Sequence, residues 1–288
     1  MSIDGVELDA ADTPANASRF GYRSAKGGGH GPYPLVLVMA LAECGTHAVT
    51  AIETGNADDA EQPLALSLAR TPRNPEPGML VMADRGIYSY PLLTAVREAG
   101  ADFALRVTAK LDLPVLERLP DGSYRSYIAE PKTKNLTSSR SRLAKGAMDI
   151  TELPGTHVRV VDYDVPGRGK GEVFTVVTSV LDYQELPAPE IAAAYDQRWE
   201  IEIAFDEIET RQRGPGTVLR SRSPDLVLQE LYGLLITHYA IRQLMTEAAD
   251  QAELDPDRLS FTRTLNIVRR QVTAQAAFSP LPPETGND

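Results

Sequence analysis

Tyr195, Arg198 and Glu202 are the residues of this 288-residue chain whose types and spacing best suit chemistry on a phosphate ester. They are three and then four positions apart, so in an α-helix their side chains lie on one face. A guanidinium and a phenol can bind phosphate oxygens, and a carboxylate can bind a hard divalent cation. The same spacing is typical of a salt-bridged helix surface, so the helix alone leaves both interpretations open.

Two aspartates fall at points where a predicted strand would present them. Residues 80–83 form an apolar run, which predicts a buried strand, and Asp84 follows it directly. Residues 3–8 combine Ile, Val and Leu with acids, which predicts a short strand around Asp4. Because Mg²⁺ is a hard cation that prefers oxygen ligands, both carboxylates are candidates for cation binding.

The segment that starts at Tyr195 resembles the Y-R-E-K signature of bacterial insertion-sequence transposases of the DDE type. That signature reads Y-x2-R-x3-E-x6-K. Tyr195, Arg198 and Glu202 match it, whereas Glu209 stands at the position where the family has Lys. Arg211 lies close in sequence but is not on the same face of the predicted helix.

Two further segments resemble the same family and occur in the family's order. Residues 78–89 resemble an apolar strand that ends in a catalytic Asp, here Asp84, followed by Arg85 and Gly86. Residues 3–16 resemble the segment around the first catalytic Asp, here Asp4. The resemblance extends over nearly the whole chain. Family members normally carry an additional DNA-binding region before this point, so we expect an N-terminally truncated catalytic core.

The resemblance implies a DNA transposase core that cuts and joins DNA strands at the ends of an insertion element. It implies that Asp4, Asp84 and Glu202 are the catalytic residues and that they bind two Mg²⁺ (or Mn²⁺) ions. Two such ions, roughly 3.5–4 Å apart, can hold the attacking and leaving oxygens of a phosphodiester. The competing acids are Glu200 and Asp206 on the predicted helix, and Asp9 and Asp12 after the first strand.

The resemblance also implies contacts with DNA. Tyr195 and Arg198 would hold the DNA end near the cut, and Arg85 would meet a further phosphate. A Ser- and Thr-rich segment, predicted to be a loop, adds five basic candidates for phosphate contact, with a solvated loop as the alternative. These are Lys132, Lys134, Arg140, Arg142 and Lys145. The expected partner is double-stranded DNA, both terminal repeats and target, bound by a homodimer in analogy with the family.

The composition sets limits on these expectations. The net charge of −11 argues against DNA binding through a generally basic surface, although the local distribution of charge matters more than the sum. The single cysteine, Cys44, excludes an internal disulfide framework. No secretory signal is visible, and no apolar run reaches the roughly 18 residues of a membrane span. We therefore predict a cytoplasmic, nucleoid-associated protein.

The order of predicted elements indicates a mixed α/β fold, and the resemblance implies a ribonuclease-H-like core interrupted by a mostly β insertion. We assign the first part of that core to residues 1–109 and the insertion to residues 110–181. Residues 182–250 would complete the core with the helix that carries Glu202 and a following helix. Residues 251–288 would form a C-terminal helix and tail, partly disordered.

Several local elements are predicted within these parts. Residues 9–33 are rich in Gly, Pro and Asp and predict a long loop. Residues 46–54 predict a strand that contains His47 as an ordinary strand residue. Prolines at one end and Gly214 at the other bound a predicted helix over residues 188–212. A second helix is predicted over residues 224–248, with a core-facing stripe of Leu226, Leu231, Leu234, Leu235 and Tyr239.

Two other functions stay open. The first is a non-catalytic, truncated transposase remnant that folds and binds DNA or dimerises without cleavage. It is favoured by Glu209, the acidic net charge and the early position of Asp4. The second is a metal-dependent nuclease of the same fold that does not transfer strands.

Overall fold

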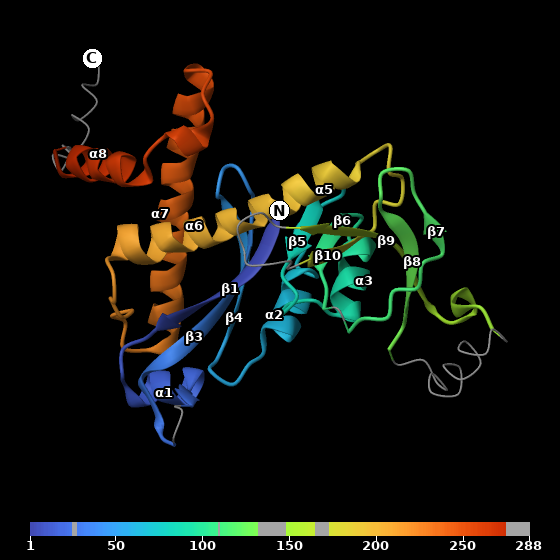
Figure 1. Cartoon of the computed structure of the whole chain (residues 1–288). Helices are drawn as coiled ribbons and strands as arrows, with labels where there is room; N and C mark the ends of the chain where they lie inside the picture. The colour runs from blue at the N-terminus through green and yellow to red at the C-terminus, as the bar shows by residue number, and fades with distance from the viewer. Residues whose placement is uncertain (25–27, 109, 132–147, 165–172, 275–288) are drawn as a thin grey trace, which may run out of the picture.

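In the computed structural model, which describes residues 1–24, 28–108, 110–131, 148–164 and 173–274, ten strands form one mixed sheet (Figure 1). The sheet is continuous because each strand pairs with a neighbour in the order β2-β3-β1-β5-β6-β10-β9-β8-β7, with β4 paired to β3. The strands are β1 (Ser2–Asp9), β2 (Tyr22–Ser24), β3 (His30–Ala42), β4 (Val49–Gly55), β5 (Leu80–Ala83), β6 (Asp102–Arg106), β7 (Glu117–Arg118), β8 (Tyr124–Ala129), β9 (Gly155–Asp164) and β10 (Val173–Thr178).

The type of strand pairing changes twice across the sheet. β4, β3 and β1 are antiparallel neighbours, whereas β1, β5 and β6 are parallel. Beyond β6 the strands are antiparallel again, from β10 to β7. Two short helices provide the connections that parallel strands need: α2 (Glu61–Leu68) before β5 and α3 (Tyr90–Glu98) before β6.

Helices cover both faces of the sheet. α2 and α3 pack with alternate strand residues, such as Val81 and Phe103, in one apolar cluster. The residues that alternate with these, Met82 and Ala104, lie on the other face with α5. The helical elements on that face and beyond are α1 (Pro14–Phe20), α5 (Ala188–Asp196), η2 (Gln197–Trp199), α6 (Glu200–Asp206), η3 (Glu207–Arg213), α7 (Pro224–Gln251), η4 (Pro256–Arg258) and α8 (Phe261–Ala274); η1 (Ile150–Glu152) lies before β9.

The helical segment from α5 to η3 is nearly continuous and runs across the sheet (Figure 1). Ile191 of α5 packs against the sheet, and Ile201 and Phe205 of α6 pack against Ala40 and Ala42 of β3. The segment ends at Gly214, whose φ of 101° lies in the region that favours glycine. The predicted helix over residues 188–212 is thus confirmed, although its turns change from α to 3₁₀, back to α and then to π geometry.

Three local predictions are wrong. The predicted loop 9–33 contains α1 and β2, because Thr13 caps a helix that starts with Pro14: the Thr13 hydroxyl accepts a hydrogen bond from Asn16 N–H. His47 is not a strand residue; it lies in the turn before β4 with φ of 58°. The stripe predicted for α7 is only partly buried, since Leu226 and Tyr239 are about half exposed while His238 and Arg242 are buried.

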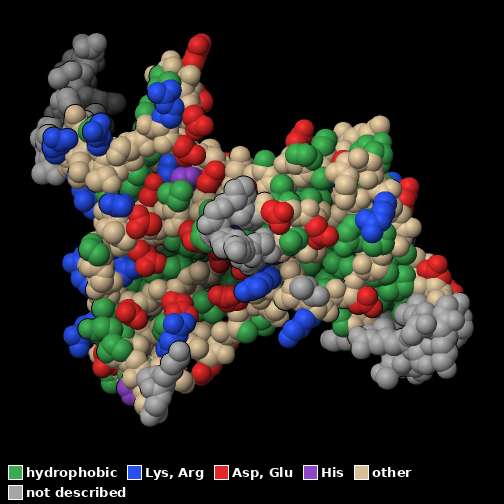
Figure 2. All heavy atoms as spheres, viewed as in Figure 1, with side chains coloured by type: hydrophobic (Ala, Val, Ile, Leu, Met, Phe, Trp, Pro, Cys, Tyr) green, Lys and Arg blue, Asp and Glu red, His purple; other side chains and the backbone are tan. Residues whose placement is uncertain are grey.

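The strands of the predicted insertion extend the same sheet, because β10 pairs with β6. The mixed α/β class is therefore confirmed, while the ribonuclease-H-like assignment and the boundaries of the parts stay predictions. No helix of the described residues is long and apolar enough to cross a membrane. On the face shown in Figure 2, acidic and basic side chains of the described residues are interspersed, without a continuous basic surface.

Candidate active site

Asp4 and Asp84 lie side by side at the middle of the sheet. β1 and β5 are parallel with Ile3 paired to Ala83, so each aspartate is the next residue along its strand. Asp84 follows the last residue of β5, whereas β1 continues past Asp4 to pair with β3. The strand pairing therefore places these two carboxylates on neighbouring strands, as the sequence predicts.

The pKa of Asp4 is raised above its usual value. Burial is the main cause, and the negative charge of Asp84 adds to it. A hydrogen bond from Gly5 N–H, 2.8 Å from Asp4 Oδ1, and the guanidinium of Arg198 act in the opposite direction. Neighbouring carboxylates whose charges raise each other's pKa favour a cation between them or a shared proton.

Arg198 connects Asp4 with Glu202. Its Nη1 lies 2.9 Å from Asp4 Oδ2, and its Nη2 lies 3.7 Å from Glu202 Oε1. The Arg198 side chain is 7% exposed, whereas that of Glu202 is 45% exposed. The helix therefore places Glu202 on the same guanidinium that pairs with Asp4.

Tyr195 shares the face of Arg198, as its spacing predicts: the Arg198 guanidinium carbon lies 5.9 Å from the centre of the Tyr195 ring. Its phenol is buried and donates a hydrogen bond of 3.2 Å to the carbonyl of Ala83, the residue before Asp84. Burial raises the pKa of this phenol. In this structure Tyr195 fixes the end of β5 relative to the helix.

The other basic residues that could bind DNA phosphates differ in their surroundings. Arg85 is exposed next to Asp84. Arg106 of β6, which the sequence did not single out, lies 3.6 Å from Asp84 Oδ1 through its Nη1. The predicted phosphate contacts Lys132, Lys134, Arg140, Arg142 and Lys145 lie outside the described residues.

A fourth acid, Glu61, faces the same site and was missed from the sequence. It is the first residue of α2, and burial together with the charges of Asp4 and Asp84 raises the pKa of its carboxyl group. A Cβ placed on Gly5 would lie 3.1 Å from Glu61 Oε1, so the side chain lies against β1 next to Asp4. Acids are common in the first turn of a helix because they interact favourably with the helix dipole. The position of Glu61 in the sequence therefore did not mark it as a site residue.

The competing acids are engaged elsewhere. Asp12 accepts a hydrogen bond of 2.6 Å from the Tyr22 hydroxyl. Asp206 pairs with Arg211 at 3.1 Å. Glu200 accepts a hydrogen bond from Gly45 N–H, away from Asp4. Three of the four alternatives therefore have their own partners outside the site.

Glu209, at the family's Lys position, is half-buried. Burial raises the pKa of its carboxyl group, Arg213 lowers it, and Asp206 and Asp9 raise it further. This acid consequently belongs to a charged group at the end of the helix and not to the cluster around Arg198.

The donor set suits a hard divalent cation, since Asp4, Asp84, Glu202 and Glu61 offer only carboxylate oxygens. Asp84 Oδ1 is buried and has no hydrogen-bond partner, and it is an acceptor that a cation would satisfy. The ligand atoms of Asp4, Asp84 and Glu202 do not all lie within 4.8 Å of one another, however. Among the described residues, the group of possible ligands with that spacing is His47, Glu200 and Asp257.

Carboxylates on two neighbouring central strands of a mixed α/β sheet, with a further carboxylate on the helix beside them, form a class of site suited to metal-dependent chemistry on phosphate esters. The chain belongs to the transposase DDE domain family, whose model matches residues 1–239. It is 29% identical over 285 residues to the transposase InsG for insertion sequence element IS4 of Escherichia coli (strain K12). That match covers 97% of this chain and 60% of the relative, so the chain spans less than two thirds of the relative's length.

Proposed function

We propose that this chain is the DNA-cutting core of an insertion-element transposase and that Asp4, Asp84 and Glu202 bind its divalent cations, two Mg²⁺ or Mn²⁺ ions. The observation that carries this proposal is the junction of the three carboxylates: adjacent parallel strands bear two of them, and Arg198 links the third to the first. When bound, such cations would stabilise charge on the attacking and leaving oxygens of a phosphodiester.

The topology supports a ribonuclease-H-like core. Three antiparallel strands, β4, β3 and β1, are followed by the parallel strands β5 and β6, with helices on both faces. β7 to β10 would then be the β-rich insertion over residues 110–181, between the parts assigned to residues 1–109 and 182–250. The C-terminal part, residues 251–288, would begin with η4 and α8.

Of the residues around the carboxylates, some would position them and others would bind DNA. Tyr195 is proposed to hold the end of β5, and hence Asp84, against the helix. Arg198 neutralises Asp4 in this structure, and a cation bound at Asp4 would weaken that ion pair. The guanidinium would then be available for a DNA phosphate, with the exposed Arg85 as a second contact. We propose double-stranded DNA as the substrate and a homodimer as the form that pairs two ends.

Cleavage of a labelled oligonucleotide duplex that carries the terminal repeat flanking the gene tests this proposal, with Mg²⁺ or Mn²⁺ titrated. Asp4→Asn, Asp84→Asn and Glu202→Gln are each expected to lower the cleavage rate by about a thousandfold or more, since each removes a cation ligand. Asp206→Asn is the matched control, because Asp206 is exposed on the same helix. Full activity of Glu202→Gln would overturn the assignment.

The non-catalytic remnant is the second candidate, favoured by the buried position of Arg198 and by Glu209 in place of the family's Lys. It predicts that the folded wild-type chain binds the same duplex in a gel-shift assay but cuts it with neither cation. Cleavage by the wild type, abolished by Asp84→Asn, would reject it.

A further inference from the structure

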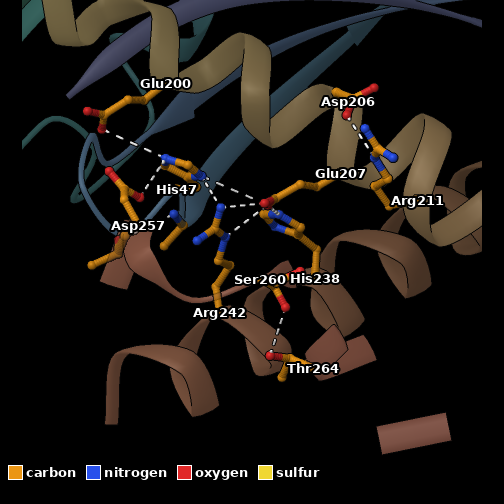
Figure 3. Close-up of polar contacts among 12 residues, drawn as sticks. His47, Glu200, Asp206, Glu207, Arg211, His238, Arg242, Asp257, Ser260 and Thr264 are labelled. Atoms are coloured by element: carbon orange, nitrogen blue, oxygen red, sulfur yellow. Dashed lines mark hydrogen bonds and ion pairs between the residues drawn. The ribbon is translucent and has the colours of Figure 1, made fainter. Parts of the chain in front are cut away.

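We propose that His47, Glu200 and Asp257 form a second cation site, for a transition metal of the zinc class, distinct from the all-carboxylate site (Figure 3). Its three residues come from separate parts of the chain. His47 lies in the turn between β3 and β4, Glu200 is the first residue of α6, and Asp257 lies in η4. We call this group the His47 site.

The distances in the His47 site are close to those of a coordination sphere. His47 Nε2 lies 3.4 Å from Asp257 Oδ1 and 3.9 Å from Glu200 Oε2. All three ligand atoms lie within 4.8 Å of one another. In a tetrahedral zinc site with bonds of about 2.0–2.2 Å, ligand atoms are roughly 3.4 Å apart, so small side-chain movements would close the site.

The imidazole of His47 is the observation that points to a ligand. Its side chain is 3% exposed, and its Nε2 is buried without a hydrogen-bond partner while it faces the two carboxylates. A buried polar atom without a partner costs free energy, which a bond to a metal ion would recover. The turn that delivers this ring has a left-handed backbone at His47, which is uncommon for a residue other than glycine.

The groups behind the ring include a donor that metal binding must displace. Nδ1 of His47 contacts Nη2 of Arg242, and because a guanidinium only donates, Nδ1 accepts this hydrogen bond and Nε2 carries the proton. A bound metal takes the lone pair of Nε2, so the proton must move to Nδ1 and the contact with Arg242 must open. Glu207 Oε2, 3.9 Å from Nδ1, would then accept the new hydrogen bond, as carboxylates commonly do behind metal-bound histidines. Glu207 is itself held by His238 Nε2 at 2.9 Å and by Arg242 Nε at 2.8 Å (Figure 3).

The donor set separates the His47 site from the carboxylate site. One imidazole with two carboxylates suits Zn²⁺ and its neighbours, whereas carboxylates alone suit Mg²⁺. Asp257 is 43% exposed, which leaves a path for the ion and a side where water can complete the coordination. The His47 site would join η4, just before α8, to the helix that carries Glu202 two residues after Glu200. A bound ion would therefore stabilise the C-terminal helices against the core.

Calorimetric titration of the chelator-treated full chain with Zn²⁺ tests this proposal. The wild type and the Asp4→Asn variant are expected to bind one Zn²⁺ at the His47 site with similar affinity. His47→Gln and Asp257→Asn are expected to weaken that binding at least about tenfold. Glu253→Gln, an exposed acid near η4, is the matched control and is expected to bind as the wild type does.

Two further measurements fix the interpretation. Replacement of Zn²⁺ by Co²⁺ is expected to give the visible absorption of a four-coordinate ion in the wild type and to lose it in Asp257→Asn. Because Asp257 is exposed, this variant keeps the test valid if His47→Gln does not fold, which circular dichroism would reveal. A wild type that binds no Zn²⁺, or an Asp257→Asn variant that binds it equally well, would overturn the proposal and leave a metal-free cluster of ion pairs.

Discussion

Nη1 of Arg198 lies 2.9 Å from Oδ2 of Asp4, so the helix contributes a positive charge to the first carboxylate of the sheet. The guanidinium is almost fully buried, and Asp4 is only partly open to solvent. An ion pair in such a place holds the helix in register with β1, because breaking it leaves a buried charge with weaker compensation: Arg198 would keep the longer contact with Glu202, and Asp4 would keep the hydrogen bond from Gly5 N–H. Under the proposed function, a divalent cation at Asp4 would have to compete with Arg198.

Removal of the guanidinium is expected to destabilise the fold. Arg198→Ala leaves Asp4 without its cation, and we expect a loss of about 2–4 kcal/mol in the free energy of unfolding by urea. Arg198→Lys keeps the charge and should recover part of this. Arg211→Ala, which removes an exposed pair with Asp206, is the control and should cost less than about 1 kcal/mol. Equal losses for Arg198→Ala and Arg211→Ala would contradict a structural ion pair at Asp4.

Glu61 is expected to attract cations to the site without being essential for cleavage. Glu61→Gln removes one negative charge beside Asp4 and Asp84, which at an intermediate dielectric is worth about 1–2 kcal/mol toward a cation. The Mn²⁺ concentration for half-maximal cleavage should therefore rise about tenfold, while the rate at saturating Mn²⁺ changes little. Glu98→Gln, an exposed acid at the end of α3, serves as the control. An unchanged Mn²⁺ dependence would exclude Glu61 from the site.

Tyr195→Phe separates the observed contact from a direct contact with DNA. The variant loses the hydrogen bond to the Ala83 carbonyl, and we expect a loss of about 1 kcal/mol in the free energy of unfolding. Because the phenol is buried, the affinity for the cleaved duplex should stay within about threefold of the wild type, equivalent to less than about 1 kcal/mol. A much larger loss of affinity in a gel-shift titration would instead indicate that the hydroxyl reaches DNA.

Asp121 gives a prediction for the dependence of stability on pH. Burial alone would raise its pKa, but hydrogen bonds from Ser123 and from Ala188 N–H, with the charge of Arg159, outweigh burial and lower it. A carboxyl whose pKa is lower in the folded state stabilises the fold above its unfolded pKa of about 3.9, and this contribution is lost as the pH falls through the folded value.

Asp121→Asn should therefore destabilise the protein at pH 7, by about 3 kcal/mol, because Arg159 is buried and loses its anionic partner. The difference between variant and wild type should shrink when urea unfolding is measured below about pH 3. Asp225→Asn, at an exposed site in the first turn of α7, is the control. A difference that does not depend on pH would show that Asp121 acts through its shape and not through its charge.

Much of the fold followed from local patterns. The apolar run before Asp84 is β5, and prolines and Gly214 bound the helix that carries Glu202 within a residue of their predicted places. These signals are local: strand ends, proline at the first turn and glycine after the last. The antiparallel extension of the sheet from β6 to β10 depends on pairing between distant segments, which no short window of sequence contains.

The site was harder to predict because its geometry depends on contacts between elements. Spacing placed Tyr195, Arg198 and Glu202 on one face, and the structure agrees. Spacing could not tell that Arg198 is buried against Asp4, or that Glu61 faces the same aspartates. The buried polar group of Glu207, His238 and Arg242 occupies positions that a hydrophobic pattern assigns to solvent, so its discovery required coordinates.

Arg159 is fully buried and bonds on two sides: its Nε and Nη2 reach Ser123 and Asp121, and its Nη1 reaches the carbonyl of Leu186, two residues before α5. Arg159 of β9 thereby connects the β7–β8 turn with the segment just before α5. A pull on the outer strands would pass through these bonds into the helical segment that begins with α5, carries Glu202 and ends at Gly214. The far edge of the sheet is thus mechanically coupled to the carboxylates at its middle.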